Sequence, residues 1–207
     1  MAHIIRDRTK EETLIIKKDF SELINLLYGL SINFFIDSGL LLGIYRDGDI
    51  IKWDWDIEIS LIDSNFTDNL SKIVEKAKEK GFLIHKIDKK LLKLEIYRGL
   101  PYKIFSFTFK GWKHDKKTGY FKRKEFEIPE KYFLNEKKIV FMNFELNCPG
   151  PIEDYLTFMY GDWKTPMRSN NIEEYLTKNF YKKENFLIKS LKRSFYKIKH
   201  LYEKYIR

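Results

Sequence analysis

Three acidic residues, Asp54, Asp56 and Glu58, alternate with apolar ones in the run WDWDIEI. Successive side chains of a β-strand point to opposite faces, so neighbouring acids on one face would stand roughly 7 Å apart. Carboxylates this close repel one another and raise one another's pKa. A divalent cation would relieve that repulsion, and carboxylate oxygens suit Mg²⁺ or Mn²⁺. The run therefore indicates a metal-dependent enzyme.

Capping and turn signals predict the elements that lead up to this strand. Thr9 and Glu12 have the spacing of a capping box, and apolar residues recur at helical intervals as far as about Tyr28. A short strand, a turn, a short helix and a second turn are then expected at residues 32–36, 37–39, 40–45 and 47–49. The acidic strand itself is expected from about Lys52 to Leu61.

The remainder of the chain mixes strands and helices. Further helices are expected over residues 65–80, 151–160 and 183–205, and further strands over residues 82–87, 91–97, 102–109, 120–128 and 138–146. The strands at 91–97 and 102–109 form a predicted hairpin. This order of elements predicts an α+β fold, with a mixed sheet flanked by helices and a C-terminal amphipathic helix.

Composition narrows the class of protein and partner. Of the 207 residues 43% are hydrophobic and 16% aromatic, which is enough for a packed core. The net charge of +9 indicates an anionic partner, such as a phosphate-rich substrate, nucleic acid or an acidic membrane surface. No apolar run is long enough to span a bilayer or to act as a signal peptide, and the single Cys148 fits a reducing cytosol. We therefore expect a cytoplasmic protein.

Two multi-residue motifs resemble the signatures of the LicD and fukutin-related family. The first combines the run SGLLLGIYR at residues 38–46 with WDWDIE at residues 53–58. The second is PIEDYL at residues 151–156, followed by YGDWKTP at residues 160–166. Together they extend the resemblance over roughly residues 20 to 166. The family shares the nucleotidyltransferase order of a glycine-containing turn followed by a strand with Asp-x-Asp/Glu.

The resemblance implies an activity and a set of site residues. Family members transfer a phospho-substituent, of phosphocholine or phospho-alditol type, from a CDP-linked donor to a sugar hydroxyl of a surface glycan such as lipopolysaccharide, capsule or teichoic acid. Asp56 and Glu58 match the family's metal-binding pair, and Asp54 matches the acid before it. The matching glycines and basic residue are Gly39, Gly43 and Arg46.

Physical chemistry is consistent with these implied roles. A divalent cation would neutralise the donor pyrophosphate while the phosphorus–oxygen bond breaks. Gly39 would let backbone N–H groups approach phosphate without a Cβ in the way, and the start of the following helix favours anions. Arg46 could bind phosphate through its fork of donors, and Ser38 could supply a hydroxyl contact.

The sequence departs from the family pattern at two positions that matter for chemistry. Leu40 stands where the family usually has Ser or Thr, so a hydroxyl contact is lost. Lys103 stands where it often has a third acid, and a lysine could instead bind phosphate or act as a base with a depressed pKa. Glu95, on the preceding strand, is the candidate replacement carboxylate.

The sequence predicts two regions, a nucleotidyltransferase-fold domain at residues 1–182 and a basic amphipathic helix at residues 183–207. Apolar residues recur there at helical spacing and are flanked by lysines and arginines. Such a helix suits an anionic membrane surface, where each basic residue adds about 1 kcal/mol. The same stripe would equally suit packing on the domain or pairing in a dimer. Membrane binding would place the protein peripherally on the inner face and near a lipid-linked glycan acceptor.

Two other interpretations stay open from the sequence. The acidic strand and the positive charge also fit a nucleotidyltransferase that modifies RNA, protein or a small molecule. The second glycine-containing motif, YGDWKTP, argues against that interpretation and against nucleic acid as partner. Leu40 and Lys103 leave room for a catalytically degenerate homologue that binds glycan or membrane.

Overall fold

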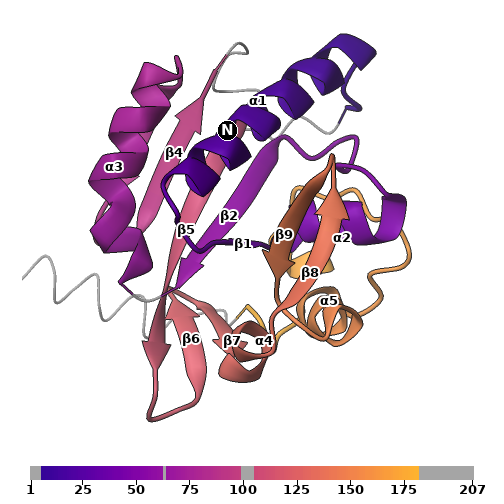
Figure 1. Ribbon diagram of the computed structural model, residues 1–207. Helices are drawn as coiled ribbons and strands as arrows, with labels where there is room; N and C mark the ends of the chain where they lie inside the picture. The colour runs from indigo at the N-terminus through magenta and orange to yellow at the C-terminus, as the bar shows by residue number, and fades with distance from the viewer. Residues whose placement is uncertain (1–5, 63, 99–104, 182–207) are drawn as a thin grey trace, which may run out of the picture.

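A seven-stranded mixed sheet forms the centre of the computed structural model, which describes residues 6–62, 64–98 and 105–181 (Figure 1). Five strands lie in the order β1-β2-β5-β4-β3. Their bounds are β1 Phe35–Ile36, β2 Asp56–Ile62, β3 Leu83–Asp88, β4 Lys93–Tyr97 and β5 Ser106–Asp115. The end of β5 also pairs with β6 (Tyr120–Arg123), which pairs with β7 (Phe126–Pro129). β2 and β5 run parallel and the other pairs antiparallel, so the expected α+β fold with a mixed sheet is confirmed.

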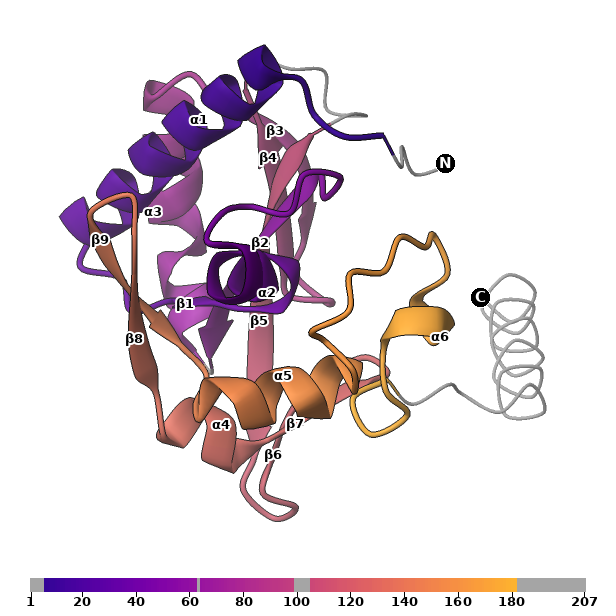
Figure 2. The ribbon, with the colours of Figure 1, turned by 90° about the vertical axis from the view of Figure 1, so that its right-hand side faces the viewer.

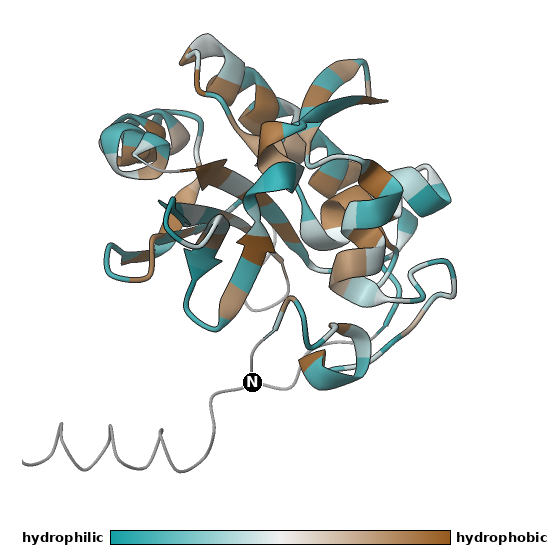
Figure 3. Cartoon of the chain, turned by 90° about the horizontal axis from the view of Figure 1, so that it is seen from below, coloured by the Kyte–Doolittle hydropathy of each residue, from teal (hydrophilic) through white to brown (hydrophobic). Residues whose placement is uncertain are grey.

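Two helices, α1 (Lys10–Gly29) and α3 (Asn65–Glu79), cover one face of this sheet (Figures 1 and 2). The capping box of α1 is present, because the side chain of Thr9 accepts from Glu12 and that of Glu12 from Thr9. α3 is amphipathic and carries both hydrophobic and hydrophilic residues in Figure 3. Its buried side chains recur at helical intervals, at Phe66, Leu70, Ile73 and Ala77.

The parallel pair β2 and β5 separates an apolar face from a polar one. Ile57, Ile59, Phe107 and Phe109 are almost fully buried, and Phe107 packs edge-on against Phe82 at 5.8 Å between ring centres. The residues between them project to the opposite face, because side chains alternate along each strand. The register sets Asp56 opposite Ser106, Glu58 opposite Thr108 and Ser60 opposite Lys110. The polar side chains of two strands are thereby brought together.

The segment before β2 differs from its sequence prediction. Helix α2 spans Ser38–Asp47, so the turn expected at residues 37–39 is already helical from Ser38 onward. Asp37 precedes the helix and Gly48 ends it in a left-handed conformation, with φ 71°. β2 begins at Asp56 rather than Lys52, because residues 52–53 form a turn. The prediction that all three acids lie on one strand was therefore wrong for Asp54, which precedes β2.

Two predicted single strands are hairpins instead. Residues 120–128 contain β6 and β7, and residues 137–148 contain β8 (Lys137–Phe141) and β9 (Phe144–Cys148). The turns use left-handed residues that are not glycine, Lys124 in the first and Met142 and Asn143 in the second. Lysine and methionine rarely adopt such φ values, so Asn143 is the one ordinary turn residue among these three.

The C-terminal half adds three helices. They are α4 (Glu130–Leu134), α5 (Ile152–Tyr160) and α6 (Ile172–Tyr175), of which α5 was expected and the two short ones were not. α2 and α5 lie beyond the β1 edge of the sheet (Figure 1). Within the part of the chain that the structure describes, no helix combines the length and apolar character needed to cross a bilayer. The predicted helix over 183–205, the boundary after residue 182 and Lys103 lie outside the described residues.

Candidate active site

The three predicted acids occupy different structural settings. Asp54 lies in the turn before β2, while Asp56 and Glu58 project from the strand itself. The backbone N–H of Asp54 donates to the Ile51 carbonyl at 3.0 Å, and the Asp56 N–H donates to Asp54 Oδ1 at 3.3 Å. Asp54 therefore folds back beside the first residue of the strand, and the structure keeps all three acids in one neighbourhood.

A buried arginine from the N-terminal segment holds the Asp54 turn in place. The Arg8 guanidinium donates to the carbonyl oxygens of Asp54, Ile50 and Ile51, the last at 2.7 Å. The Arg8 backbone N–H donates to the Lys52 carbonyl at 2.9 Å. Burial lowers the pKa of the Arg8 guanidinium. The N-terminal segment thus fixes the backbone on which Asp54 is mounted.

Asp56 is held by two hydroxyls from the neighbouring strand. Thr108 Oγ1 and Ser106 Oγ donate to its Oδ1 at 2.9 and 3.1 Å. Burial, followed by the charges of Glu58 and Asp54, raises the pKa of Asp56 to about 7. Burial likewise raises the pKa of Asp54 to about 6, and Glu58 adds to the effect. Asp56 is thus close to half protonated near neutral pH, whereas Asp54 is mostly ionised there.

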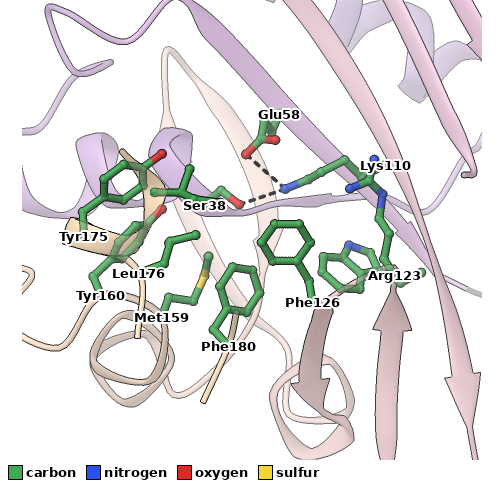
Figure 4. Close-up of a pocket in the computed structure, with 12 residues that line it drawn as sticks. Ser38, Glu58, Lys110, Arg123, Phe126, Met159, Tyr160, Tyr175, Leu176 and Phe180 are labelled. Atoms are coloured by element: carbon green, nitrogen blue, oxygen red, sulfur yellow. Dashed lines mark hydrogen bonds and ion pairs between the residues drawn. The ribbon is translucent and has the colours of Figure 1, made fainter. Parts of the chain in front are cut away.

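Glu58 differs because a buried lysine pairs with it (Figure 4). Lys110 Nζ lies 3.1 Å from Glu58 Oε2 and 3.1 Å from Asp37 Oδ1, and donates to Ser38 Oγ at 2.8 Å. Burial alone would raise the pKa of Glu58, but the Lys110 ammonium outweighs burial and lowers it. The pKa of Lys110 is raised, because Asp37 and Glu58 together outweigh its burial.

The far side of this ion pair is anchored in the core. Ser60 Oγ donates to Asp37 Oδ2 at 2.6 Å, and the indole N–H of Trp112 donates to Ser60 Oγ at 2.9 Å. Asp37, Ser60 and Trp112 are almost completely buried. Lys110 is only 4% exposed, donates to Ser38 and forms ion pairs with Asp37 and Glu58, so its ammonium acts as an internal counter-ion.

The donor set fits a divalent cation centred on Asp56. Within residues 6–62, 64–98 and 105–181, no three His, Cys, Asp or Glu side chains converge as a complete metal cluster. Mg²⁺ in enzymes is commonly held by one or two carboxylates together with water and substrate phosphate. Asp54 and Asp56 carry raised pKa values, the mark of acids whose negative charge is poorly compensated. Glu58 shares Oε2 with Lys110, which leaves its other oxygen for an ion.

The two glycines of the first motif have different surroundings. A Cβ at Gly39 would overlap the carboxylate of Asp54, so this position must be glycine for α2 to approach the acid. A Cβ at Gly43 would lie 2.6 Å from the Asp49 carbonyl oxygen and 2.7 Å from the Ile51 nitrogen. Gly43 therefore packs α2 against the loop before Asp54, while Gly39 faces the acids directly.

Arg46 lies away from the acids. It stands at the end of α2, roughly 12 Å along the helix from Ser38 at 1.5 Å per residue. Its guanidinium pairs with Asp47 at 2.8 Å and donates to the Trp163 carbonyl at 3.2 Å. These contacts join the two sequence motifs, so the geometry favours the organising role of Arg46 over direct contact with phosphate.

Glu95 shares the polar face but lies beyond β5. It pairs in register with Thr108, which in turn pairs with Glu58. Lys93 forms an ion pair with Glu95 Oε1, and His85 Nε2 lies 4.0 Å from Glu95 Oε2. Glu95 therefore lies one strand further from the acids of β2 than Thr108 does.

A pocket of about 160 Å³ opens beside Glu58 and Lys110 (Figure 4). Its polar side consists of Ser38, Glu58, Lys110 and Arg123. Its other side is mostly apolar and is built by Trp112, Phe126, Met159, Tyr160, Ile172, Tyr175, Leu176 and Phe180. The tyrosine rings of residues 160 and 175 stack 6.5 Å apart. The second sequence motif therefore reaches the acidic site through Tyr160.

Sequence reasoning missed Lys110, Arg123, Asp37 and Arg8 as parts of this site. A signal for Lys110 existed in the run FSFTFK at residues 105–110, where polar residues alternate with phenylalanines. The alternation places Ser106, Thr108 and Lys110 on one face of their strand. It does not show which strand lies beside them. Arg8 and Arg123 carry no comparable pattern.

Comparison with known proteins identifies one matching family. A family model described as LicD/FKTN/FKRP, nucleotidyltransferase domain, matches residues 31–150. This range includes the first sequence motif and ends before Pro151, where the second motif begins. No curated protein matches the chain.

Two solved structures of ANT(2'')-Ia resemble the model in outline. One is the solution structure of this antibiotic-resistance factor, with a TM-score of 0.46, 11% identity and coverage of 66% of each chain. The other is a crystal structure of ANT(2'')-Ia in complex with adenylyl-2''-tobramycin, with a TM-score of 0.45 and 10% identity over 68% of this chain and 74% of that one. In the first comparison the match spans just under two thirds of the other protein.

Proposed function

Because the chain belongs to the LicD/FKTN/FKRP family, we propose that it is a metal-dependent transferase acting on a surface glycan. It would move a phospho-substituent, of phosphocholine or phospho-alditol type, from a CDP-linked donor to a sugar hydroxyl. The observation that carries this proposal is the Asp54–Asp56–Glu58 neighbourhood, in which one acid is paired with a lysine and two have raised pKa values.

Asp56 and Glu58 would hold Mg²⁺ or Mn²⁺, with Asp54 beside them. The cation would supply charge neutralisation for a pyrophosphate that gains negative charge as it breaks. Lys110 would keep Glu58 ionised and fixed, and the hydroxyls of Ser106 and Thr108 would orient Asp56. Gly39 would allow the start of α2 to approach the donor, next to Ser38.

Lys103 stays a prediction for the acceptor side, either as a phosphate-binding group or as a base. Glu95 is supported less well, because its carboxylate contacts Lys93 on the far side of β5. The glycan acceptor, a cytoplasmic location and attachment to an anionic membrane through residues 183–207 are likewise part of the proposal.

A thermal-shift experiment with the full chain tests the proposal. CDP, CDP-choline, CDP-ribitol, CDP-glycerol, ATP and UTP are each added with and without Mg²⁺. We expect stabilisation only by the CDP compounds, only with metal, and not in Asp56→Asn. Asp68→Asn, an exposed acid of α3, is the matched control and should respond like the wild type.

Two other outcomes would replace the proposal. Stabilisation by ATP or UTP in preference to CDP compounds would favour a nucleotidyltransferase with another acceptor. A lack of any nucleotide effect, together with equal behaviour of the wild type and Asp56→Asn, would favour a catalytically inactive relative.

A further inference from the structure

Arg123 is a partly buried cation that forms no ion pair with a carboxylate of the residues that the structure describes. It ends β6 and lines the pocket beside Lys110 (Figure 4). Its Nε is buried without a hydrogen-bond partner, and within the described part of the chain no carboxylate lies within 4.0 Å of its guanidinium. Burial lowers the pKa of Arg123, although Glu58 and Asp37 act in the opposite direction from further away. Such a group is stabilised when an anion arrives.

Lys110 is less suited than Arg123 to bind an anionic ligand. It already donates to Ser38 and forms ion pairs with Asp37 and Glu58, and only 4% of the residue is exposed. A ligand that took Lys110 would leave two carboxylates without their cation. Arg123 is therefore the better-placed cation of the pocket for a ligand, because its Nε has no hydrogen-bond partner among the described residues. Its planar fork matches a phosphoryl group through two parallel hydrogen bonds.

The side of the pocket facing Arg123 selects the organic part of the ligand. Phe126, Met159, Ile172, Leu176 and Phe180 offer no side-chain hydrogen-bond donor to it. The hydroxyls of Tyr160 and Tyr175 remain protonated, because burial raises the pKa of Tyr175 to about 12 and that of Tyr160 well above its ordinary value. A polyol would bury several hydroxyls here with only two phenols to satisfy them, and each unpaired one costs about 1–3 kcal/mol.

The pocket is large enough to hold only part of a CDP-linked donor. A cavity of about 160 Å³ is smaller than the roughly 300–1,000 Å³ typical of sites for whole drug-sized ligands. A single phosphoryl group with a compact organic part fits that space, whereas an entire nucleoside diphosphate derivative does not.

From these contacts we infer that the pocket binds a phosphate ester, with its phosphoryl oxygens on Arg123 and a compact apolar organic part against Phe126, Tyr160 and Tyr175. Its place in catalysis rests on the proposed function, as the subsite for the transferred phospho-substituent. Of the two substituent types named above, the pocket disfavours the phospho-alditol.

Isothermal titration of the full chain in EDTA, without nucleotide, tests this inference. The probes are phenyl phosphate, glycerol phosphate and inorganic phosphate. We expect phenyl phosphate to bind about tenfold more tightly than glycerol phosphate, since the latter buries unpaired hydroxyls. Arg123→Gln should weaken phenyl phosphate by about tenfold, because a charge-assisted hydrogen bond is lost. Arg123→Lys keeps the charge but not the fork of donors, so its affinity for phenyl phosphate should lie between those of the wild type and Arg123→Gln.

Lys122→Gln is the matched control for charge. Lys122 is adjacent on β6 but pairs with Asp115 at 2.9 Å, away from the pocket lining, so its loss should leave binding unchanged. Melting curves establish that each variant is folded, and Arg123→Lys keeps the test decisive if Arg123→Gln is not. Equal affinity for glycerol phosphate, no measurable binding, or unchanged binding in a folded Arg123 variant would overturn the inference. Because no metal or nucleotide is present, these results are independent of the Asp56→Asn test.

Discussion

The two faces of the β2–β5 pair use the same strands for opposite purposes. On one face Ile57, Ile59, Phe107 and Phe109 are almost completely buried against the helical side of the sheet. On the other face Asp56 and Glu58 stand opposite Ser106 and Thr108, with the Lys110 ammonium between Glu58 and Asp37. The apolar face lowers the free energy of the fold, while the acids concentrate charge that the fold alone balances incompletely. The difference indicates that part of the polar face exists for a ligand.

The largest effect is expected on the apolar face. Phe107→Ala should lower the free energy of unfolding by about 3–5 kcal/mol, because it removes a buried aromatic ring and leaves a cavity. Chemical denaturation measures this change. Leu83→Ala, at a residue that is 56% exposed on the edge strand β3 of the same sheet, should change it by less than about 0.5 kcal/mol. Similar losses in both variants would show that the two settings do not differ as described.

The next largest effect is expected at the internal counter-ion. Lys110→Met should lower the free energy of unfolding by about 3 kcal/mol at pH 8, because Asp37 and Glu58 are left without their cation. The loss should shrink toward pH 4, because Asp37 and Glu58 of the variant, which lack the ammonium, take up protons there. Lys113→Met, an exposed lysine on the same strand, is the control. A loss that does not depend on pH would mean that packing, rather than charge, is what Lys110 provides.

Asp56, a carboxyl group with a raised pKa, should behave in the opposite direction. The folded-state pKa of Asp56, about 7, lies above its unfolded value, so the folded state holds more protons and stability falls as pH rises from about 4 to 7. Asp56→Asn removes that penalty and should raise the free energy of unfolding at pH 8 by about 2 kcal/mol, with little gain at pH 4. Denaturation curves at the two pH values measure it. A variant less stable than the wild type at pH 8 would contradict the assignment of Asp56 as a poorly compensated acid.

The smallest effect on the fold is expected from the C-terminal region. Deleting the residues after Glu184 should leave the melting temperature of the domain unchanged while abolishing binding to anionic liposomes, because the basic residues are removed. Liposome sedimentation with and without anionic lipid measures this. Undiminished sedimentation of the truncated protein would assign membrane binding, if any, to another surface.

Local patterns predicted most of the fold. The capping box of Thr9 and Glu12, the α3 boundaries and the helix after Pro151 all rest on signals between residues close in sequence. The hairpins at 120–129 and 137–148 were missed because Lys124 and Met142 supply the left-handed φ that a glycine would have announced. The turn expected at 37–39 was wrong because Ser38 itself begins α2 in a left-handed conformation, with φ 53°.

The candidate site was only partly readable from the sequence. The acids and Gly39 could be named, because their spacing carries the chemistry. Lys110 could not be paired with Asp37, which lies 73 positions earlier, nor Arg8 with the Asp54 turn, because such contacts depend on the tertiary fold. The division of the three acids into one paired with lysine and two with raised pKa values follows from those long-range contacts.

The central claim is that Asp56 and its neighbours hold a divalent ion that in turn binds a pyrophosphate. Anomalous diffraction from crystals grown with Mn²⁺ and a CDP compound tests it most directly. We expect a manganese peak within coordination distance of Asp56, bridged to the diphosphate and next to Glu58 or Asp54. Diphosphate bound without metal, or manganese absent from these carboxylates at saturating concentration, would contradict it.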